Sequence, residues 1–198
     1  RRRGWTLFVA CCGVLLVISS MVALNTALGD IAMATSANQT QLTWIIDSYT
    51  LILACLLLPA GALGDRYGRR GALLFGLAIF AVASIVPALN THPMHIIAAR
   101  GAAGVGAAFI MPATLSTVNA TFRGRHRAAA FGVWGAVNSG AAAIGPLTGG
   151  VLTQYLSWPW IFWVNIPLGC VVFVAALLTV RETRSREIGS GSDLIGAV

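Results

Sequence analysis

Charged residues are scarce in this sequence of 198 residues: only 10% are charged, whereas an ordinary soluble domain has about 25%. Lysine is absent, all 13 basic residues are arginines, and only 6 residues are acidic. Hydrophobic residues, by contrast, make up 57% of the chain. The composition therefore excludes an ordinary water-soluble domain and indicates a membrane protein.

Patterns typical of metal, nucleotide and catalytic sites are also missing. The four cysteines lie in apolar runs, without a C-x-x-C pair or metal-ligand spacing. No phosphate-binding loop of the form G-x-x-x-x-G-K-[ST] occurs, and no nucleophile, base and orienting acid stand together. The arginines form no stripe with interleaved aromatic residues. We therefore expect neither an enzyme nor a nucleic-acid-binding protein, and no metal.

Long apolar runs make up most of the sequence. A helix needs about 20 apolar residues to cross a bilayer core about 30 Å thick, because backbone polar groups in lipid must pair within the segment. Six runs meet this requirement: Trp5–Leu28, Leu42–Leu63, Gly71–Leu89, His95–Val118, Ala128–Leu152 and Trp160–Val180. The sequence thus predicts an all-α, polytopic membrane protein with a bundle of six transmembrane helices over residues 1–181.

The arginines are confined to alternate connections between these runs. All except Arg100 precede the first run, follow the second, fourth or sixth, or lie next to those ends: Arg1, Arg2, Arg3, Arg66, Arg69, Arg70, Arg123, Arg125, Arg127, Arg181, Arg184 and Arg186. The positive-inside rule then predicts a multi-pass protein of the cell (inner) membrane, with the N-terminus and residues 181–192 in the cytoplasm. Residues 182–192 are polar, as in a cytoplasmic linker, and residues 193–198 turn apolar, as at the start of a truncated seventh span.

The connection between the second and third runs has a distinctive pattern, GALGDRYGRRG. Its key residues are Gly61, Leu63, Gly64, Asp65, Arg66, Gly68, Arg69 and Arg70. This pattern resembles the G-x-L-a-D-r-x-G-r-r loop of the major facilitator superfamily. Glycines permit a tight turn, and an acid beside arginines permits charge-assisted hydrogen bonds. The resemblance implies a cytoplasmic gating loop that steadies the outward-facing state; a simple topological anchor is the alternative.

Further patterns resemble the fourteen-helix drug:proton antiporters of that superfamily. The fourth run resembles l-x-x-x-R-x-x-q-G-x-g at Ile96, Arg100, Gly104 and Gly106, with Ala103 at the glutamine position. The fifth resembles the antiporter motif at Gly132, Gly145, Pro146, Gly149 and Gly150, and residues 158–169 resemble the branch's W-r-W-i-F-l-i-N-v-P-i-G signature. The resemblance implies an N-terminal domain of two three-helix inverted repeats, whose partner is a missing C-terminal transmembrane half.

The first run departs from that branch. Its expected pattern, l-D-x-t-i-v-N-v-A-L-P, survives at Asn25, Ala27 and Leu28, but Ser20 stands in the place of the acid. This substitution removes one candidate protonation site.

Two ionisable residues, Asp47 and Arg100, lie well inside the predicted spans. Because a charge inside a membrane is costly, such residues are functional candidates. Asp47 could titrate protons or attract cations; alternatively, the two form a structural ion pair in one layer of the bundle. Further candidates for contact with substrate are the polar residues Ser20, Asn25 and Asn138. Tyr49, Trp134, Phe109 and Met111 could line a cavity for aromatic or cationic compounds.

These features together lead us to expect a proton-coupled antiporter that exports amphipathic, often cationic compounds by alternating access. The proton gradient would supply the energy, with no cofactor. Its partners would be the lipid bilayer, the substrate and the other half of the protein. One alternative keeps the fold but exports a lipid, siderophore or metabolite, or acts as a uniporter. A second alternative is a non-transporting membrane sensor or scaffold.

Overall fold

A computed structural model describes residues 2–180 of this protein. The expected linker at 182–192 and seventh span at 193–198 lie outside the described residues. Within them the chain forms six helices and no strand: α1 Arg2–Thr35, α2 Gln39–Tyr67, α3 Arg69–Leu89, α4 Pro93–Thr121, α5 Arg125–Tyr155 and α6 Trp160–Thr179. The all-α, six-helix prediction is confirmed.

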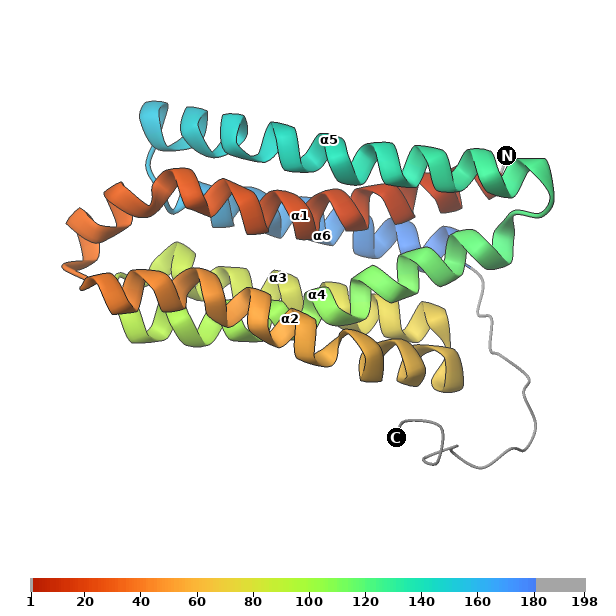
Figure 1. Cartoon of the computed structure of the whole chain (residues 1–198), viewed down its shortest axis with the longest axis horizontal. Coiled ribbons are helices and arrows are strands. Elements are labelled where there is room, and N and C mark those ends of the chain that lie inside the picture. Colours follow the sequence, from red (N-terminus) through yellow and green to blue (C-terminus); the bar gives the residue numbers. More distant parts are fainter. Residues whose placement is uncertain (1, 181–198) are drawn as a thin grey trace, which may run out of the picture.

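Each three-helix half of the bundle contributes one helix that packs mainly against the other half. α1 lies along α5 and also contacts α6, whereas α4 packs most extensively on α2 and α3 (Figure 1). The first helix of each three-helix half therefore packs mainly against the other half. α1 and α4 also run in opposite directions (Figure 1). This reciprocal arrangement is the one expected of inverted repeats.

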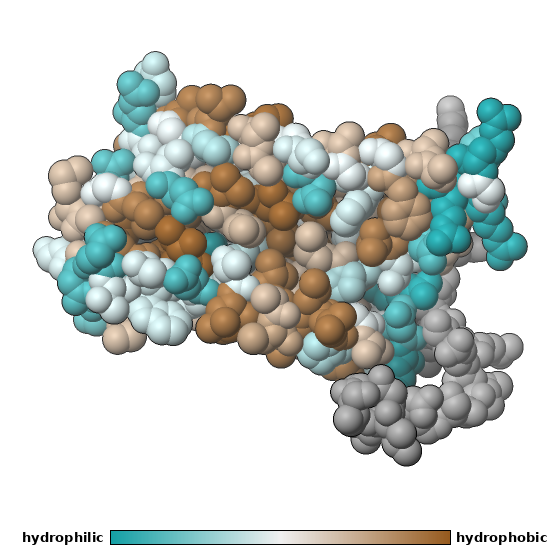
Figure 2. Space-filling view, viewed as in Figure 1, coloured by the Kyte–Doolittle hydropathy of each residue, from teal (hydrophilic) through white to brown (hydrophobic). Residues whose placement is uncertain are grey.

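The arginine-bearing segments among residues 2–180 gather at one end of the bundle. The start of α1 and the α2–α3 and α4–α5 connections all lie at the right of Figure 1, whereas Arg181, Arg184 and Arg186 lie outside the described residues. Hydrophilic residues cover that end in Figure 2, whereas brown, apolar residues are frequent along the length of the bundle. The predicted clustering of the arginine-rich turns is therefore confirmed.

The connections are shorter than the sequence suggested, because the helices run past the apolar segments. α1 continues to Thr35, so the predicted connection 29–41 shrinks to residues 36–38. Asn38 then starts α2 with a capping box: its side chain accepts from the Gln41 amide at 2.9 Å, and Gln41 Oε1 accepts from the Asn38 amide at 3.0 Å. The added residues 29–35 of α1 bury Ile31 in the apolar core, but Gly29 and Asp30 interrupt the apolar run, which is why hydropathy missed them.

The predicted gating loop is a single residue. Arg66 lies in the last turn of α2, Arg69 and Arg70 lie in the first turn of α3, and only Gly68 separates the helices. Gly68 has φ 128°, in the region that favours glycine. The arginines are thus held on helices rather than on a flexible loop.

Five of the six helices are long and apolar enough to cross a membrane by length and composition: α1, α2, α3, α4 and α6. α5 has 31 residues but is not among them. The reason is its sequence, which is rich in glycine and includes Asn138 and Gln154. α5 nevertheless lies beside α1 within the bundle (Figure 1).

Small residues let the central helix α4 approach its neighbours closely. At the α3–α4 crossing, a Cβ added to Gly76 would lie 2.7 Å from the Gly106 carbonyl oxygen. A Cβ added to Gly106 would likewise lie 2.7 Å from the Gly76 carbonyl oxygen. Such backbone contact is typical of helices in membranes, where van der Waals packing drives association.

Gly106→Ala is expected to destabilise the bundle by about 1–3 kcal/mol, because the new methyl group meets backbone atoms that cannot rotate away. Thermal unfolding of the full-length protein in detergent measures this effect. Gly29→Ala is the matched control, since Gly29 also lies in a helix but has nothing within 4 Å of its added Cβ. Equal losses for the two variants would contradict the close α3–α4 crossing.

Candidate functional site

A buried arginine joins three helices of the bundle. Arg100 of α4 is 1% exposed. Its Nε donates to the Ile45 carbonyl oxygen of α2 at 3.2 Å, and its Nη1 donates to Ser20 Oγ of α1 at 3.2 Å. The guanidinium carbon lies 4.2 Å from the centroid of the Tyr49 ring. The charge is therefore stabilised by hydrogen bonds and by the face of an aromatic ring.

Tyr49 extends this contact to a second point on α1. It is fully buried, and its hydroxyl donates to the Val17 carbonyl oxygen at 3.0 Å. A Cβ added to Gly104 would lie 2.7 Å from the Tyr49 carbonyl oxygen, so this glycine allows α2 and α4 to come together at the ring. Tyr49 is thus part of the core and does not line an open cavity.

Arg100 has no carboxylate partner in the part of the chain that the structure describes. The ion pair found among residues 2–180 is Asp65–Arg69. Asp47 is exposed, so the alternative of an Asp47–Arg100 ion pair is wrong. The reason is helical geometry: Ile45, Ser48 and Tyr49 are buried on one face of α2, and Asp47 falls outside that face.

Ser20 is the α1 residue that contacts the Arg100 side chain. Ser20, 3% exposed, stands where the resemblance expects an acid, and its hydroxyl accepts the Arg100 hydrogen bond. A carboxylate at this position would lie against the guanidinium. Here the buried cation instead has neutral partners, which leaves its charge unbalanced within the bundle.

Asp47 lines a groove at the end of the bundle opposite the arginine-rich turns. The groove has a volume of about 450 Å³ and lies between the end of α1 and the start of α2. Its lining residues are Leu28, Gly29, Ala32, Gln39, Leu42, Thr43, Ile46 and Asp47. A carboxylate among apolar side chains in an open groove can attract a cation that also has apolar surface.

The other predicted contact residues are dispersed. Asn25 is exposed and Asn138 is half-buried, and neither makes a hydrogen bond among residues 2–180. Phe109 packs edge-to-face on Phe75 at 5.1 Å, and Met111 packs against the main apolar core. The structure therefore does not bring these residues into one site with Asp47.

Trp134 of α5 faces α4. Its Nε1 donates to Thr114 Oγ1 at 3.4 Å, and its ring packs against the small apolar cluster formed by Ala10, Val118 and Ala130. It therefore helps to hold α5 against α1 and α4.

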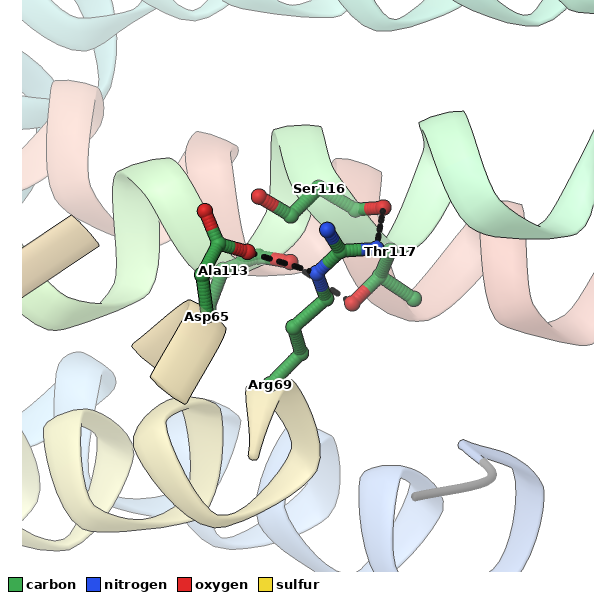
Figure 3. A network of polar contacts seen from close by, with 5 residues as sticks. All are labelled: Asp65, Arg69, Ala113, Ser116 and Thr117. Atoms are coloured by element: carbon green, nitrogen blue, oxygen red, sulfur yellow. Dashed lines mark hydrogen bonds and ion pairs between the residues drawn. The ribbon is translucent and has the colours of Figure 1, made fainter. Parts of the chain in front are cut away.

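The predicted gating residues form a polar network at the α2–α3 turn. Asp65 accepts from Arg69 Nε at 2.8 Å, and Arg69 Nη1 donates to the Ser116 carbonyl oxygen of α4 at 3.4 Å (Figure 3). Next to it, Thr117 Oγ1 donates to the Ala113 carbonyl oxygen at 2.6 Å. The turn is thereby tied to the end of α4.

Arg70 ties the same turn to α6. Its Nη2 donates to the Leu177 carbonyl oxygen at 2.7 Å, in the last turn of that helix, where a cation is favourable. Arg66 instead stacks on the Tyr67 ring, 5.5 Å from the centroid. The i,i+4 spacing of Asp65 and Arg69 was visible in the sequence, but the carbonyl acceptors on α4 and α6 were not.

Two of the antiporter-motif glycines of α5 lie against α1, and the other two have open space beside them. A Cβ added to Gly145 would lie 3.1 Å from Val22 Cβ, and one added to Gly149 would collide with the Ala23 carbonyl oxygen. These two glycines therefore allow α5 to approach α1. Gly132 and Gly150 have nothing within 4 Å among the described residues, and Pro146 lies within the helix.

The comparisons with known proteins agree with this architecture. The profile described as "Major Facilitator Superfamily" matches residues 9–195. The chain belongs to this superfamily. The six-helix fold is accordingly that of the N-terminal half of this superfamily.

Curated relatives are resistance and export proteins. The chain is 41% identical over 188 residues to "Methyl viologen resistance protein SmvA" of Salmonella typhimurium, covering 93% of this chain and 38% of that protein. It is 38% identical over 187 residues to "Methylenomycin A resistance protein" of Bacillus subtilis, covering 94% and 39%. It is 33% identical over 199 residues to "Tetracenomycin C resistance and export protein" of Streptomyces glaucescens, covering 100% and 37%. The chain thus spans less than two fifths of the length of these relatives.

Tyr49→Phe is expected to destabilise the protein by about 1 kcal/mol, because it removes the hydrogen bond to Val17 but keeps the ring over Arg100. Tyr49→Leu is expected to cost more, since the guanidinium also loses the aromatic face. Thermal unfolding of the full-length protein in detergent gives both values. If Tyr49→Leu proved no worse than Tyr49→Phe, the stacking contact would have no energetic role.

Proposed function

We propose that the full-length protein is a proton-coupled antiporter that exports amphipathic, often cationic compounds by alternating access. In this proposal the arginine-rich end faces the cytoplasm of the cell and the Asp47 groove faces outward. That orientation follows from the positive-inside rule, because the arginine-bearing turns share one end (Figure 1).

One observation carries the proposal: Arg100 is buried where α1, α2 and α4 meet, and it has no carboxylate partner among residues 2–180. Burying a charge inside a membrane bundle is costly, so a buried arginine of this kind is a candidate for a functional role. A fixed cation in the bundle repels a bound proton or a bound cationic compound, and this repulsion would favour the release of either one.

Asp47 would supply the exchangeable charge. In its protonated form the carboxyl is neutral; after it releases the proton to solvent, the carboxylate can bind a cation in the groove. Proton and cation then compete for one group, which is the simplest physical basis for exchange. The groove's apolar lining supports a substrate that has both charge and hydrophobic surface.

The names of the relatives support the substrate class. Methyl viologen, in the name of the Salmonella relative, is an aromatic dication, and the Streptomyces relative is named for resistance and export. The network around Arg69 and Arg70 supports a gate at the opposite end, because it joins the α2–α3 turn to α4 and α6. A change at that turn would therefore affect α4 and α6 as well as α2 and α3.

A second candidate function is favoured by Ser20. Because a hydroxyl occupies the position where the resemblance expects an acid, the protein would lack one protonation site next to Arg100. It could then export a neutral compound such as a lipid, siderophore or metabolite without proton coupling. Substrate-dependent proton release by the purified full-length protein separates the two functions, because a uniporter releases none.

Asp47→Asn and Arg100→Gln are each expected to lower proton-driven transport of methyl viologen about tenfold. Loss of one charge-assisted contact costs about 1.5 kcal/mol, which corresponds to that factor. The measurement is uptake by liposomes that contain the full-length protein, with and without a pH gradient.

Asp30→Asn is the matched control. Asp30 also lies in a helix at the groove end of the bundle, but it is not one of the residues that line the groove. Transport by this variant should remain near that of the unchanged protein. If Asp47→Asn retained full proton coupling, Asp47 would not be the exchanging group.

A further inference from the structure

Two histidine side chains meet at the α3–α4 connection, residues 90–92. His92 precedes α4 as its N-cap residue, and His95 lies in the first turn of that helix. Their ring centroids are 5.0 Å apart, and the ring planes are inclined by 41°. Both side chains are exposed, and the connection lies at the left of Figure 1, at the opposite end of the bundle from the arginine-rich turns. This pair takes no part in the proposed transport mechanism.

A hydrogen bond fixes which nitrogen of His95 is free. His95 Nδ1 lies 3.3 Å from Asn90 Oδ1, at the end of α3. An amide oxygen can only accept, so Nδ1 of the neutral ring carries the proton and Nε2 carries the lone pair. The His92 side chain does not cap α4 and makes no hydrogen bond among residues 2–180. Each ring therefore has a nitrogen available to a ligand.

The backbone between the two rings is held in a fixed turn. Pro93 is the first residue of α4, and a residue before proline is restricted to extended conformations. His92 accordingly has φ −78° and ψ 122°. The His95 amide then donates to the His92 carbonyl oxygen at 3.1 Å. Little chain entropy is lost when both rings bind one ion, because the turn that carries them is formed beforehand.

We propose that His92 and His95 bind one divalent transition-metal ion of the class that imidazole suits, such as zinc or copper. Zn–N bonds are about 2.0–2.1 Å long, so two imidazoles on one tetrahedral ion have ring centroids about 5 Å apart. The observed separation of 5.0 Å matches this value. The hydrogen bond from His95 to Asn90 is of the kind that orients a metal-binding imidazole from its second nitrogen. The expectation of no metal rested on the cysteine spacing, and only the folded connection brings these two rings together.

Water would complete the coordination of the ion. Among residues 2–180 no group of three or more His, Cys, Asp or Glu side chains is placed to hold one ion. A site with two protein ligands is open, unlike the closed four-ligand sites that stabilise a fold. The start of a helix disfavours a cation, but this effect is weak at an exposed position. Calcium and magnesium are unsuited to the site because they prefer oxygen ligands.

A bound ion would stabilise the junction of α3 and α4. Asn90 belongs to the end of α3, whereas His95 belongs to α4. Nearby, α4 is held against α2, since Ser48 Oγ donates to the Ile97 carbonyl oxygen at 3.3 Å. The ion would therefore strengthen this end of the bundle without entering the Asp47 groove, whose lining includes neither histidine.

Isothermal titration calorimetry of Zn²⁺ into the full-length protein, purified in detergent without a histidine tag, tests the proposal. His92→Gln and His95→Gln should each lower the affinity for Zn²⁺ more than about tenfold, because a single imidazole no longer chelates the ion. For the same reason, the double variant should bind no more weakly than either single variant. Mg²⁺ at the same concentration should give no binding signal.

His126→Gln is the matched control. His126 is also exposed in the first turn of a helix, α5, but it has no ring contact among residues 2–180. This variant should bind Zn²⁺ as the unchanged protein does. Absence of Zn²⁺ binding by the unchanged protein, or equal affinities of all three single variants, would overturn the proposal.

Asn90 is a positioning residue, and its role is tested separately. Asn90→Ala should lower the affinity for Zn²⁺ about tenfold, because the His95 ring loses the partner that fixes its orientation. Asn90→Asp keeps an acceptor oxygen and should retain the affinity. Thermal unfolding without metal should not distinguish the two variants, because the Asn90 side chain is exposed and makes this single hydrogen bond among residues 2–180. Equal Zn²⁺ affinities of the two variants would contradict the assigned geometry.

Discussion

The contact of the Arg100 guanidinium with the Tyr49 ring lies where α1, α2 and α4 meet. Ser20, Ile45 and Val17 complete it through hydrogen bonds, so α1, α2 and α4 are fixed to one another at a single point. A buried cation requires such partners, because an unsatisfied charge in a membrane is far more costly than the bonds are favourable. The helices can meet there only because Gly104 leaves room for the Tyr49 backbone.

The other charged contact residues lie at the two ends of the bundle. At one end Asp47 lines an open groove, and at the other the Asp65–Arg69 pair and Arg70 connect the α2–α3 turn to α4 and α6. Between them lie glycine-mediated crossings, Gly76 with Gly106 and Gly149 with α1. These crossings are rigid because backbone meets backbone. Rigid helices that link two polar ends are suited to a half that moves as one body in alternating access.

Sequence reasoning succeeded for features with a strong physical signature and failed for those that depend on where side chains meet. Apolar runs of about 20 residues are imposed by the bilayer, so the helices were predictable. Their ends were not, because Gly29 and Asp30 interrupt the apolar run of α1, whereas the helix continues to Thr35 and buries Ile31 in the core. The sequence identified Arg100 as a candidate functional residue. It did not identify its neutral hydrogen-bond partners, Ser20 and the Ile45 carbonyl, and it left an ion pair with Asp47 as an alternative.

The amino-acid sequence by itself determined that this is a helical membrane protein, that its arginines are concentrated in alternate connections between helices, and to which superfamily it belongs. These properties follow from composition and from the order of residues along one chain. Only the tertiary structure decided that Ser20 meets Arg100, that Asp47 does not, and that Arg70 reaches the carbonyl of Leu177. Such contacts join residues far apart in sequence, and carbonyl acceptors exist at every position, so no pattern of side chains marks the ones that are used.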